Sequence, residues 1–276
     1  MTWHASLALD YTLQNGQTLA RFAHQGPLRI LRSLYPQGPA ICHNVLVHPP
    51  SGLVGGDTLD IRITGAPGTH GLISTPGATR FYLSDGLPAR QHTRITLEEG
   101  ARLEWLPLEA ILYNGCLAEN RLEMDLQPGA ELLGWDVTAL GLPHAKLPFA
   151  RGSFCQHIAL QGHWLERGLL DASDDRLMNG ATGLAGQRCM ATLFFACGSP
   201  LQRPRRDQAL ALARELIDAH PLAATAAATS PNDRVLVVRA LSPVVEPAMQ
   251  LLRAIWATWR AELWQLAGTA PRIWAV

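Results

Sequence analysis

The sequence predicts an all-β dominated protein, a two-layered β-helix-like stack of short strands with about two α-helices in the C-terminal part. Three observations predict it. Short stretches of alternating apolar and polar residues fill the chain up to residue 200, a glycine-centred motif recurs about every 30 residues, and helical periodicity appears only after residue 200. We expect one domain over residues 1–276, with a β-stack in 1–200 and a helix-containing part in 201–276 packed on it.

Composition excludes several function classes. The 276 residues are 47% hydrophobic, enough for a substantial core, and 23 basic residues balance 23 acidic ones. Without a basic surplus we expect no nucleic-acid partner, and without a long apolar run or a Lys/Arg cluster we expect no membrane partner. The N-terminal residues lack the pattern of a secretory signal. Five cysteines without a C-x-x-C motif indicate reduced thiols rather than disulfides or a zinc site, so we expect a cytoplasmic protein.

Strands are predicted from the first residues onward. Alternating stretches recur between residues 7 and 35, and residues 42–48 form another strand that Pro49 and Pro50 end. In residues 58–64, Leu, Ile and Ile alternate with Asp, Arg and Thr, which is the period of two of a half-buried strand. Gly55 and Gly56 suit a tight corner before this strand, and Asp57 then stands at its head. The segment lacks the Lys-Ser/Thr ending of a phosphate loop.

A repeat is visible around four glycines. Segments 92–106 and 120–136 each alternate up to a glycine and resume beyond it, and looser copies surround two other glycines. Gly68, Gly100, Gly129 and Gly162 are 32, 29 and 33 residues apart. Repeats of this length indicate stacked supersecondary units that bury their apolar faces on one another.

The C-terminal part has a different texture. Residues 203–220 are rich in Ala and Leu and predict an amphipathic helix. Residues 221–233 read as a small-residue loop and 233–241 as a strand. A second helix is predicted to begin at Glu246 and to end at Gly268. It carries Trp256, Trp259 and Trp264, for which we weigh core packing against a partner-facing patch.

The candidate chemistry rests on carboxylates. None of the ten histidines forms a metal-ligand motif. Asp57, Glu104, Glu109, Asp136 and Glu166 lie in or beside apolar strand sequence, where a carboxylate needs a donor, water or a cation. If several lined one wet cavity, they would form weak oxygen sites from which a divalent ion can leave. Turn and solvent-facing roles remain the alternative for each.

Catalysis is less well supported by the pattern. We find no nucleophile elbow or Cys/His dyad signature and expect no enzyme. Two other interpretations stay open: a β-solenoid carbohydrate-active hydrolase using Asp57, Glu104 and Glu109 as acid and base, and a pure scaffold without an ion path.

The sequence resembles the urease accessory protein D family (UreD, called UreH in some bacteria). The motifs that carry the resemblance follow the family's order: H-P-P-S-G-L-V-G-G-D-T-L (48–59), S-T-P-G-A-T-R-F-Y (74–82), L-E-W-L-P-L-E-A-I-L-Y (103–113), G-W-D-V-T-A-L-G (134–141) and P-R-I-W-A (271–275). The chain departs from the family pattern at Leu142, where many members carry an arginine.

The resemblance implies a non-enzymatic nickel-insertion chaperone with a β-helix-like fold. It implies docking on apo-urease and on the F-type urease accessory protein, which recruits the urease accessory GTPase. It also implies transient nickel(II) as cargo, with no tightly bound cofactor, passed through an internal acidic tunnel. Matching by motif carries this role to Asp57 in G-G-D, Asp136 in G-W-D and Glu166 in W-L-E-R. We expect the C-terminal aromatic helix and the loops after residue 200 to contact the F-type protein.

Overall fold

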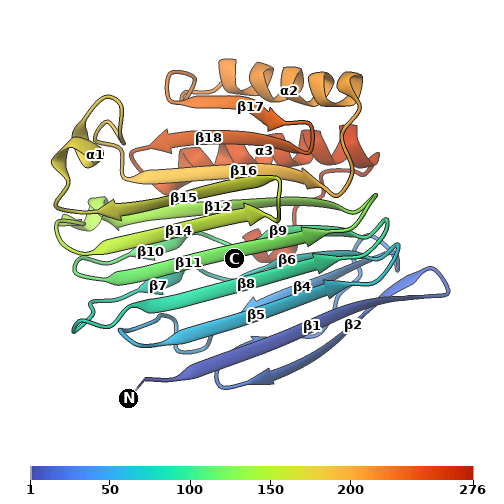
Figure 1. The fold of residues 1–276 in the computed structure, drawn as a ribbon, viewed down its shortest axis with the longest axis horizontal. Coiled ribbons are helices and arrows are strands. Elements are labelled where there is room, and N and C mark those ends of the chain that lie inside the picture. The colour runs from blue at the N-terminus through green and yellow to red at the C-terminus, as the bar shows by residue number, and fades with distance from the viewer. Residues whose placement is uncertain (1, 276) are drawn as a thin grey trace.

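Two β-sheets lie face to face in a computed structural model that describes residues 2–275 (Figure 1). The first sheet has the order β15-β14-β11-β8-β5-β1-β2 and the second β17-β18-β16-β12-β9-β6-β4-β3. The strands of the first sheet are β1 (His4–Gln14), β2 (Gln17–Gln25), β5 (Thr58–Gly65), β8 (Ala89–Leu97), β11 (Leu117–Leu126), β14 (Ser153–Leu160) and β15 (Trp164–Asp171). Those of the second are β3 (Arg29–Ile30), β4 (Ile41–Val47), β6 (His70–Ser74), β9 (Arg102–Leu106), β12 (Glu131–Leu142), β16 (Cys189–Cys197), β17 (Ala226–Asn232) and β18 (Val235–Ser242).

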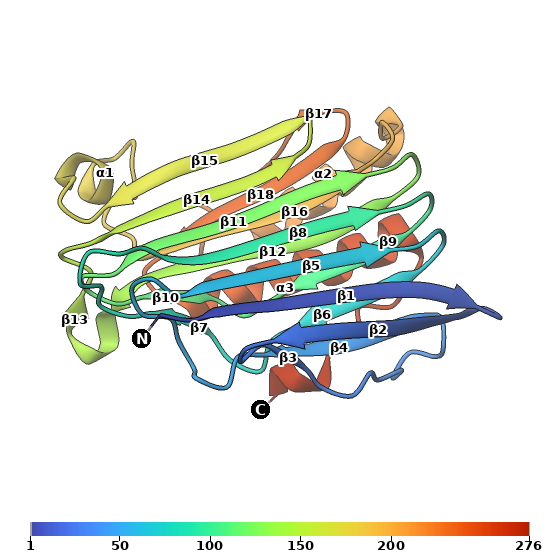
Figure 2. The same cartoon turned by 60° about the horizontal axis from the view of Figure 1, so that its bottom comes forward.

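The chain passes alternately from a strand of the first sheet to a strand of the second and so forms a solenoid of about four turns. β5, β8 and β11 of the first sheet pair in parallel and lead into β6, β9 and β12 of the second, which are also parallel. The short strands β7 (Thr79–Phe81) and β10 (Ala110–Leu112) form a third wall with the end of β12. Figure 2 shows the strands of the first sheet stacked in order from β1 to β15. The expected two-layered, β-helix-like stack is confirmed.

The repeat glycines are the corners of this solenoid. Gly68, Gly100 and Gly129 join a strand of the first sheet to one of the second, with φ of 69°, 67° and 78°. Only glycine adopts this backbone conformation without a steric cost. The prediction for Gly162 holds only in part, because its turn leads into β15, which returns antiparallel beside β14 in the same sheet.

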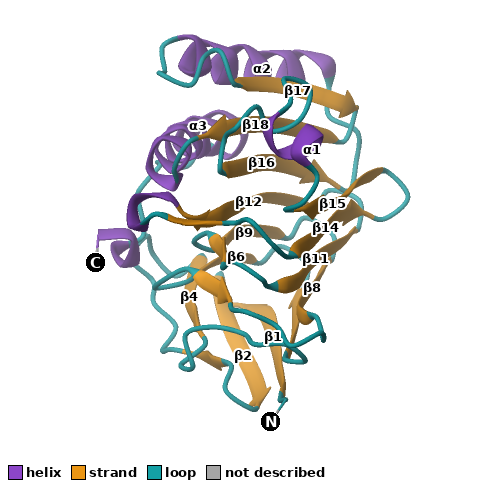
Figure 3. Ribbon diagram, turned by 90° about the vertical axis from the view of Figure 1, so that its left-hand side faces the viewer, coloured by secondary structure: helices purple, strands orange, loops and turns teal. Residues whose placement is uncertain are grey.

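The space between the sheets holds the main core. Leu59, Ile61 and Ile63 on β5 are buried there, as the alternation predicts, and the residues between them face outward. A second core lies on the other side of the second sheet, where α2 (Arg203–Asp218) and α3 (Val245–Trp264) cover it (Figure 3). Trp256, Trp259 and Trp264 are at most 4% exposed in this core, so of the two roles weighed for them the structure shows core packing and not a partner-facing patch.

Three details differ from the predictions. Residues 226–232, expected in a loop, form strand β17, because antiparallel pairing with β18 overrides the weak strand propensity of alanine. Helix α3 ends at Trp264 rather than at Gly268, since Gln265 already takes the left-handed conformation. The short helix α1 (Asp175–Asn179) was not expected, although Asp174 caps it in the usual way, accepting from the amide of Leu177. No helix within residues 2–275 is long and apolar enough to span a membrane.

Candidate functional site

One layer of the core between the sheets is polar. On the first sheet it consists of three carboxamides on neighbouring strands, Gln91, Asn120 and Gln156, which share one register. Asp136 on β12 of the second sheet faces them, because alternate residues of this strand point between the sheets. Apolar residues surround this layer on both sheets. A buried polar row in an apolar core needs internal hydrogen bonds.

Asp136 receives those bonds from both sheets. Asn120 Nδ2 donates to Oδ2 at 2.7 Å, Gln156 Nε2 donates to Oδ1 at 2.5 Å, and Thr138 Oγ1 donates to Oδ1 at 3.3 Å. Gln91 Nε2 extends the row by donating to Asn120 Oδ1 at 3.3 Å. Asp136 is thus the negative centre of a continuous hydrogen-bonded chain between the sheets.

The pKa of Asp136 lies close to neutral pH. The pKa of Asp136 is raised to about 6: burial is the largest cause, the negative charge of Glu166 also raises it, and hydrogen bonds from Gln156, Thr138 and Asn120 oppose the rise. The carboxylate therefore exchanges protons close to physiological pH. Such a group can bind a cation and release it again, because a proton competes for the same oxygens.

Glu166 lies where this layer reaches the surface. On the edge strand β15 it accepts hydrogen bonds from Arg239 of β18, one of them from Nε to Oε1 at 3.3 Å. The side chain of Glu166 is 20% exposed and that of Arg239 51%. The structure therefore places Glu166 within electrostatic range of Asp136, at an open edge between the two sheets.

Asp57 stands apart from these two carboxylates. It is 1% exposed at the head of β5, where Oδ1 accepts from the amide of Trp3 at 3.1 Å and Oδ2 from the amide of Val54 at 3.0 Å. Both oxygens thus hold backbone groups of the N-terminal segment and of the glycine turn. The arrangement suits a structural clamp, the turn role that the Gly-Gly-Asp sequence also suggests.

A cavity of about 230 Å³ opens at the corner between the second sheet and the third wall, which β7 and β10 form. His48, Ser51 and Gly52 line one side, residues 75–80 another, and Gln91 lies at its inner wall. Since Gln91 is also the first member of the hydrogen-bonded row, the cavity and the polar layer adjoin. We call it the corner pocket.

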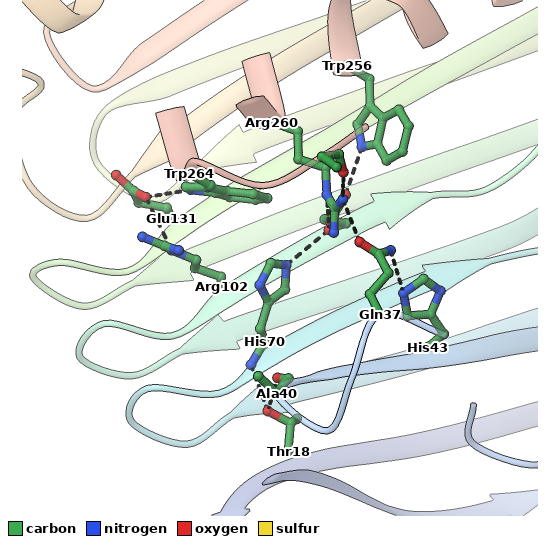
Figure 4. Close-up of polar contacts among 12 residues, drawn as sticks. Thr18, Gln37, Ala40, His43, His70, Arg102, Glu131, Trp256, Arg260 and Trp264 are labelled. Atoms are coloured by element: carbon green, nitrogen blue, oxygen red, sulfur yellow. Dashed lines mark hydrogen bonds and ion pairs between the residues drawn. The ribbon is translucent and has the colours of Figure 1, made fainter. Parts of the chain in front are cut away.

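A second buried polar cluster lies on the helix side of the second sheet (Figure 4). Glu104 on β9 is fully buried and accepts from Trp256 Nε1 at 2.8 Å and from Arg260 Nε at 3.0 Å, and its Oε1 lies 3.0 Å from His70 Nε2. Burial alone raises the pKa of Glu104, but the hydrogen bond and charge of His70 and the charge of Arg260 outweigh it, and the pKa falls below its ordinary value. The pKa of nearby His43 is lowered to about 4: burial is the largest cause, the charge of Glu104 opposes it, and the charges of Arg260 and His70 act in the same direction as burial. This cluster fastens α3 to the sheet.

These positions contradict the acid–base trio of the hydrolase interpretation. Glu104 has no exposed surface and is bound to Arg260, so no substrate reaches it. Glu109 lies in a different pocket of about 250 Å³, beside Pro243 and Glu246. Asp57 is occupied by backbone amides, so the three carboxyls do not line one cleft.

The sequence analysis missed the carboxamides that surround Asp136. A signal was present: Gln91 and Asn120 each precede a repeat glycine, Gly100 and Gly129, by nine residues and so occupy the same place in the repeat. Across residues 2–275, no three His, Cys, Asp or Glu side chains converge to hold a metal.

Comparison with known proteins identifies the family. The family model of the UreD urease accessory protein matches residues 4–275. The urease accessory protein UreD of Polaromonas sp. (strain JS666) is 66% identical over 276 residues, covering 100% of both chains. The proteins of the same name from Polaromonas naphthalenivorans and Leptothrix cholodnii are 64% and 51% identical, covering 100% and 99% of both chains, respectively. The chain therefore belongs to the UreD family of urease accessory proteins.

Proposed function

We propose that the chain is a nickel-insertion chaperone that passes nickel(II) to the urease active site through the polar layer between its sheets. In this proposal it works in the cytoplasm, docks on apo-urease and binds the F-type accessory protein, which brings the accessory GTPase. It carries out no chemical turnover of its own. Nickel is cargo, bound only in passing.

The observation that carries the proposal is the hydrogen-bonded row around Asp136. Gln91, Asn120 and Gln156 supply carboxamide oxygens once their amide groups turn, and Asp136 supplies the negative charge. Oxygen ligands with a single carboxylate bind a divalent ion weakly, whereas thiolates or several imidazoles would hold nickel tightly. Weak sites in series favour transfer, since the ion must leave each one.

The row also has an end at which an ion could be exchanged. The Glu166–Arg239 pair lies there, where the layer meets the surface. An ion at Glu166 would compete with the guanidinium of Arg239 for the same oxygens. Opening this ion pair is therefore a step that a docked partner can promote.

The test removes each carboxylate without changing its size. Asp136→Asn and Glu166→Gln, placed in a urease operon from which the native gene has been deleted, should lower nickel per urease active site and urease activity at least severalfold. The complex with urease and the F-type protein should survive, because Asp136 is buried and Glu166→Gln keeps the size of a side chain that is only 20% exposed. Asp125→Asn, on the outward face of β11, is the matched control and should transfer nickel normally.

Asp57→Asn separates the two roles of that residue. If Asp57 only clamps the amides of Trp3 and Val54, the Asp57→Asn variant should lose thermal stability, and its nickel transfer should fall only in proportion to the amount of folded protein.

For Asp136, normal nickel loading by the Asp136→Asn variant within an intact complex would contradict the ion path and favour a pure scaffold.

A further inference from the structure

Two proline- and glycine-containing loops, 48–53 and 75–80, meet at one corner of the solenoid. The amide of Leu53 donates to Arg80 O at 2.7 Å, and that of Tyr82 donates to Leu53 O at 2.8 Å, so the first loop lies along β7 like a further strand. Both loops lie within motifs that carry the family resemblance (48–59 and 74–82), yet passage of nickel along the carboxamide row does not use them. Between them lies the corner pocket.

Two residues of the pocket wall each have a side-chain nitrogen without a hydrogen-bond partner among the described residues. His48 Nε2 and Arg80 Nε are both buried and make no hydrogen bond within residues 2–275. Both residues belong to its wall. Buried polar atoms in folded proteins are rarely left unpaired, and those that are often mark a bound water or ion.

The remaining wall has the chemistry of an anion site. It contains hydroxyls, such as those of Ser51 and Thr79, but no Asp or Glu. Arginine keeps its positive charge throughout the physiological range, whereas burial lowers the pKa of His48, so that its imidazole is neutral and can donate one N–H. The charge of Asp57 opposes the effect of burial on the pKa of His48 in part, and both oxygens of Asp57 already accept hydrogen bonds from backbone amides.

We propose that the corner pocket binds a small oxyanion, a carboxylate or an inorganic oxyanion, held by Arg80 and His48. A cation would meet the guanidinium of Arg80 with no carboxylate on the wall to offset the repulsion. The volume of about 230 Å³ has room for an acetate, bicarbonate or phosphate ion but not for a nucleotide. This proposal does not depend on nickel passage.

The test titrates the full-length protein with sodium acetate, bicarbonate or phosphate at constant ionic strength, with chloride as the balancing salt. At least one of the three should bind saturably by calorimetry and raise the melting temperature, since a ligand that binds only the folded state stabilises it. Arg80→Gln and His48→Gln should weaken this binding about tenfold or more, because each removes a donor to the anion. Arg62→Gln and His24→Gln, on exposed positions of β5 and β2, are the matched controls and should bind as the parent does.

Three results would overturn the proposal: no saturable binding of any of the three oxyanions, equal binding by parent and both pocket variants, or nickel binding lost in His48→Gln but kept in Arg80→Gln. If Arg80→Gln does not fold, Arg80→Lys takes its place; it keeps the charge but lacks Nε and should bind the anion more weakly than the parent. Nickel transfer to urease is measured in parallel, so that failure of the anion site and failure of the ion path are seen separately.

Discussion

Asp136 and Glu104 are both buried carboxyls, yet their pKa values move in opposite directions. Neutral donors surround Asp136, and burial therefore raises its pKa to about 6. Glu104 meets the guanidinium of Arg260 and the imidazole of His70, and these outweigh the same burial penalty. The charge of the partners, rather than the depth of burial, decides which carboxyl stays firmly ionised. Asp136 is the exchangeable one, and Glu104 is a fixed structural anion.

This difference predicts how stability depends on pH. The folded pKa of Asp136, about 6, lies above the ordinary 3.8, so the native state holds this proton more tightly than the unfolded chain does. Its contribution is fully present below about pH 4 and is lost as pH rises to about 6, a change of about 3 kcal/mol. Asp136→Asn mimics the protonated form and should be more stable than the parent by about 1–3 kcal/mol at pH 7.5.

Urea unfolding at pH 4.5 and 7.5 measures this. The stability advantage of Asp136→Asn over the parent should be smaller at pH 4.5 than at pH 7.5. Asp125→Asn, on the outward face of β11, should show no such dependence on pH. A variant that is less stable than the parent at both pH values would mean that the hydrogen bonds to Asp136, and not its charge, dominate. If Asp136 binds nickel as proposed, the stability that the parent forgoes is the cost of keeping an ion-binding group in the core.

At the scale of elements, local patterns predict what depends on local chemistry. The strand 58–64, the corners at Gly68, Gly100 and Gly129, and helix 203–218 follow from alternation, backbone freedom and helical periodicity. Strand β17 could not be predicted in this way, because its alanines acquire strand geometry only by pairing with β18. The turn of Gly162 was ambiguous for the same reason: the glycine specifies a corner but not which sheet the next strand joins.

One buried ion pair, in addition to the apolar contacts of the second core, attaches helix α3 to the sheet. Glu104→Ala would leave the guanidinium of Arg260, which has no exposed surface, without its counterion. We expect a loss of about 3–5 kcal/mol in the free energy of unfolding. Glu104→Gln keeps acceptor atoms and should lose less, and adding Arg260→Met to Glu104→Ala should recover part of the loss.

Glu119→Ala is the matched control, since it breaks an exposed ion pair with Arg90 and should cost no more than about 1 kcal/mol. Guanidinium unfolding of the purified proteins distinguishes these cases. Equal losses for Glu104→Ala and Glu119→Ala would show that the buried pair does not anchor the helix.

For the whole molecule, α2 and α3 cover the second sheet (Figures 1 and 3). The outward face of the first sheet instead carries charged side chains on β5, β8 and β11. The sequence could predict that Asp136 lies inside, since it sits within an apolar strand. It could not predict that Asn120 and Gln156 would meet it, because that contact depends on how the two sheets face each other. The separate position of Asp57 could not be predicted either, because its partners are backbone amides.

This arrangement also changes how contact with the F-type accessory protein can be tested. Removing residues 246–276 would expose the second core, including Trp256 and Trp259, and we expect insoluble protein rather than a selective loss of binding.

The solvent-facing side of α3 allows a more specific test of contact with the F-type protein. If this side contacts the F-type protein, Gln250→Arg combined with Ala254→Arg should weaken the complex at least tenfold without changing the melting temperature, because both residues are exposed. The matched pair Ala23→Arg and Gln25→Arg places the same substitutions on exposed positions of β2, at the far edge of the first sheet. Co-purification followed by size-exclusion chromatography compares the two. Normal complex formation by the α3 variant would assign the F-type contact to another surface, and equal weakening by both pairs would attribute the effect to added charge.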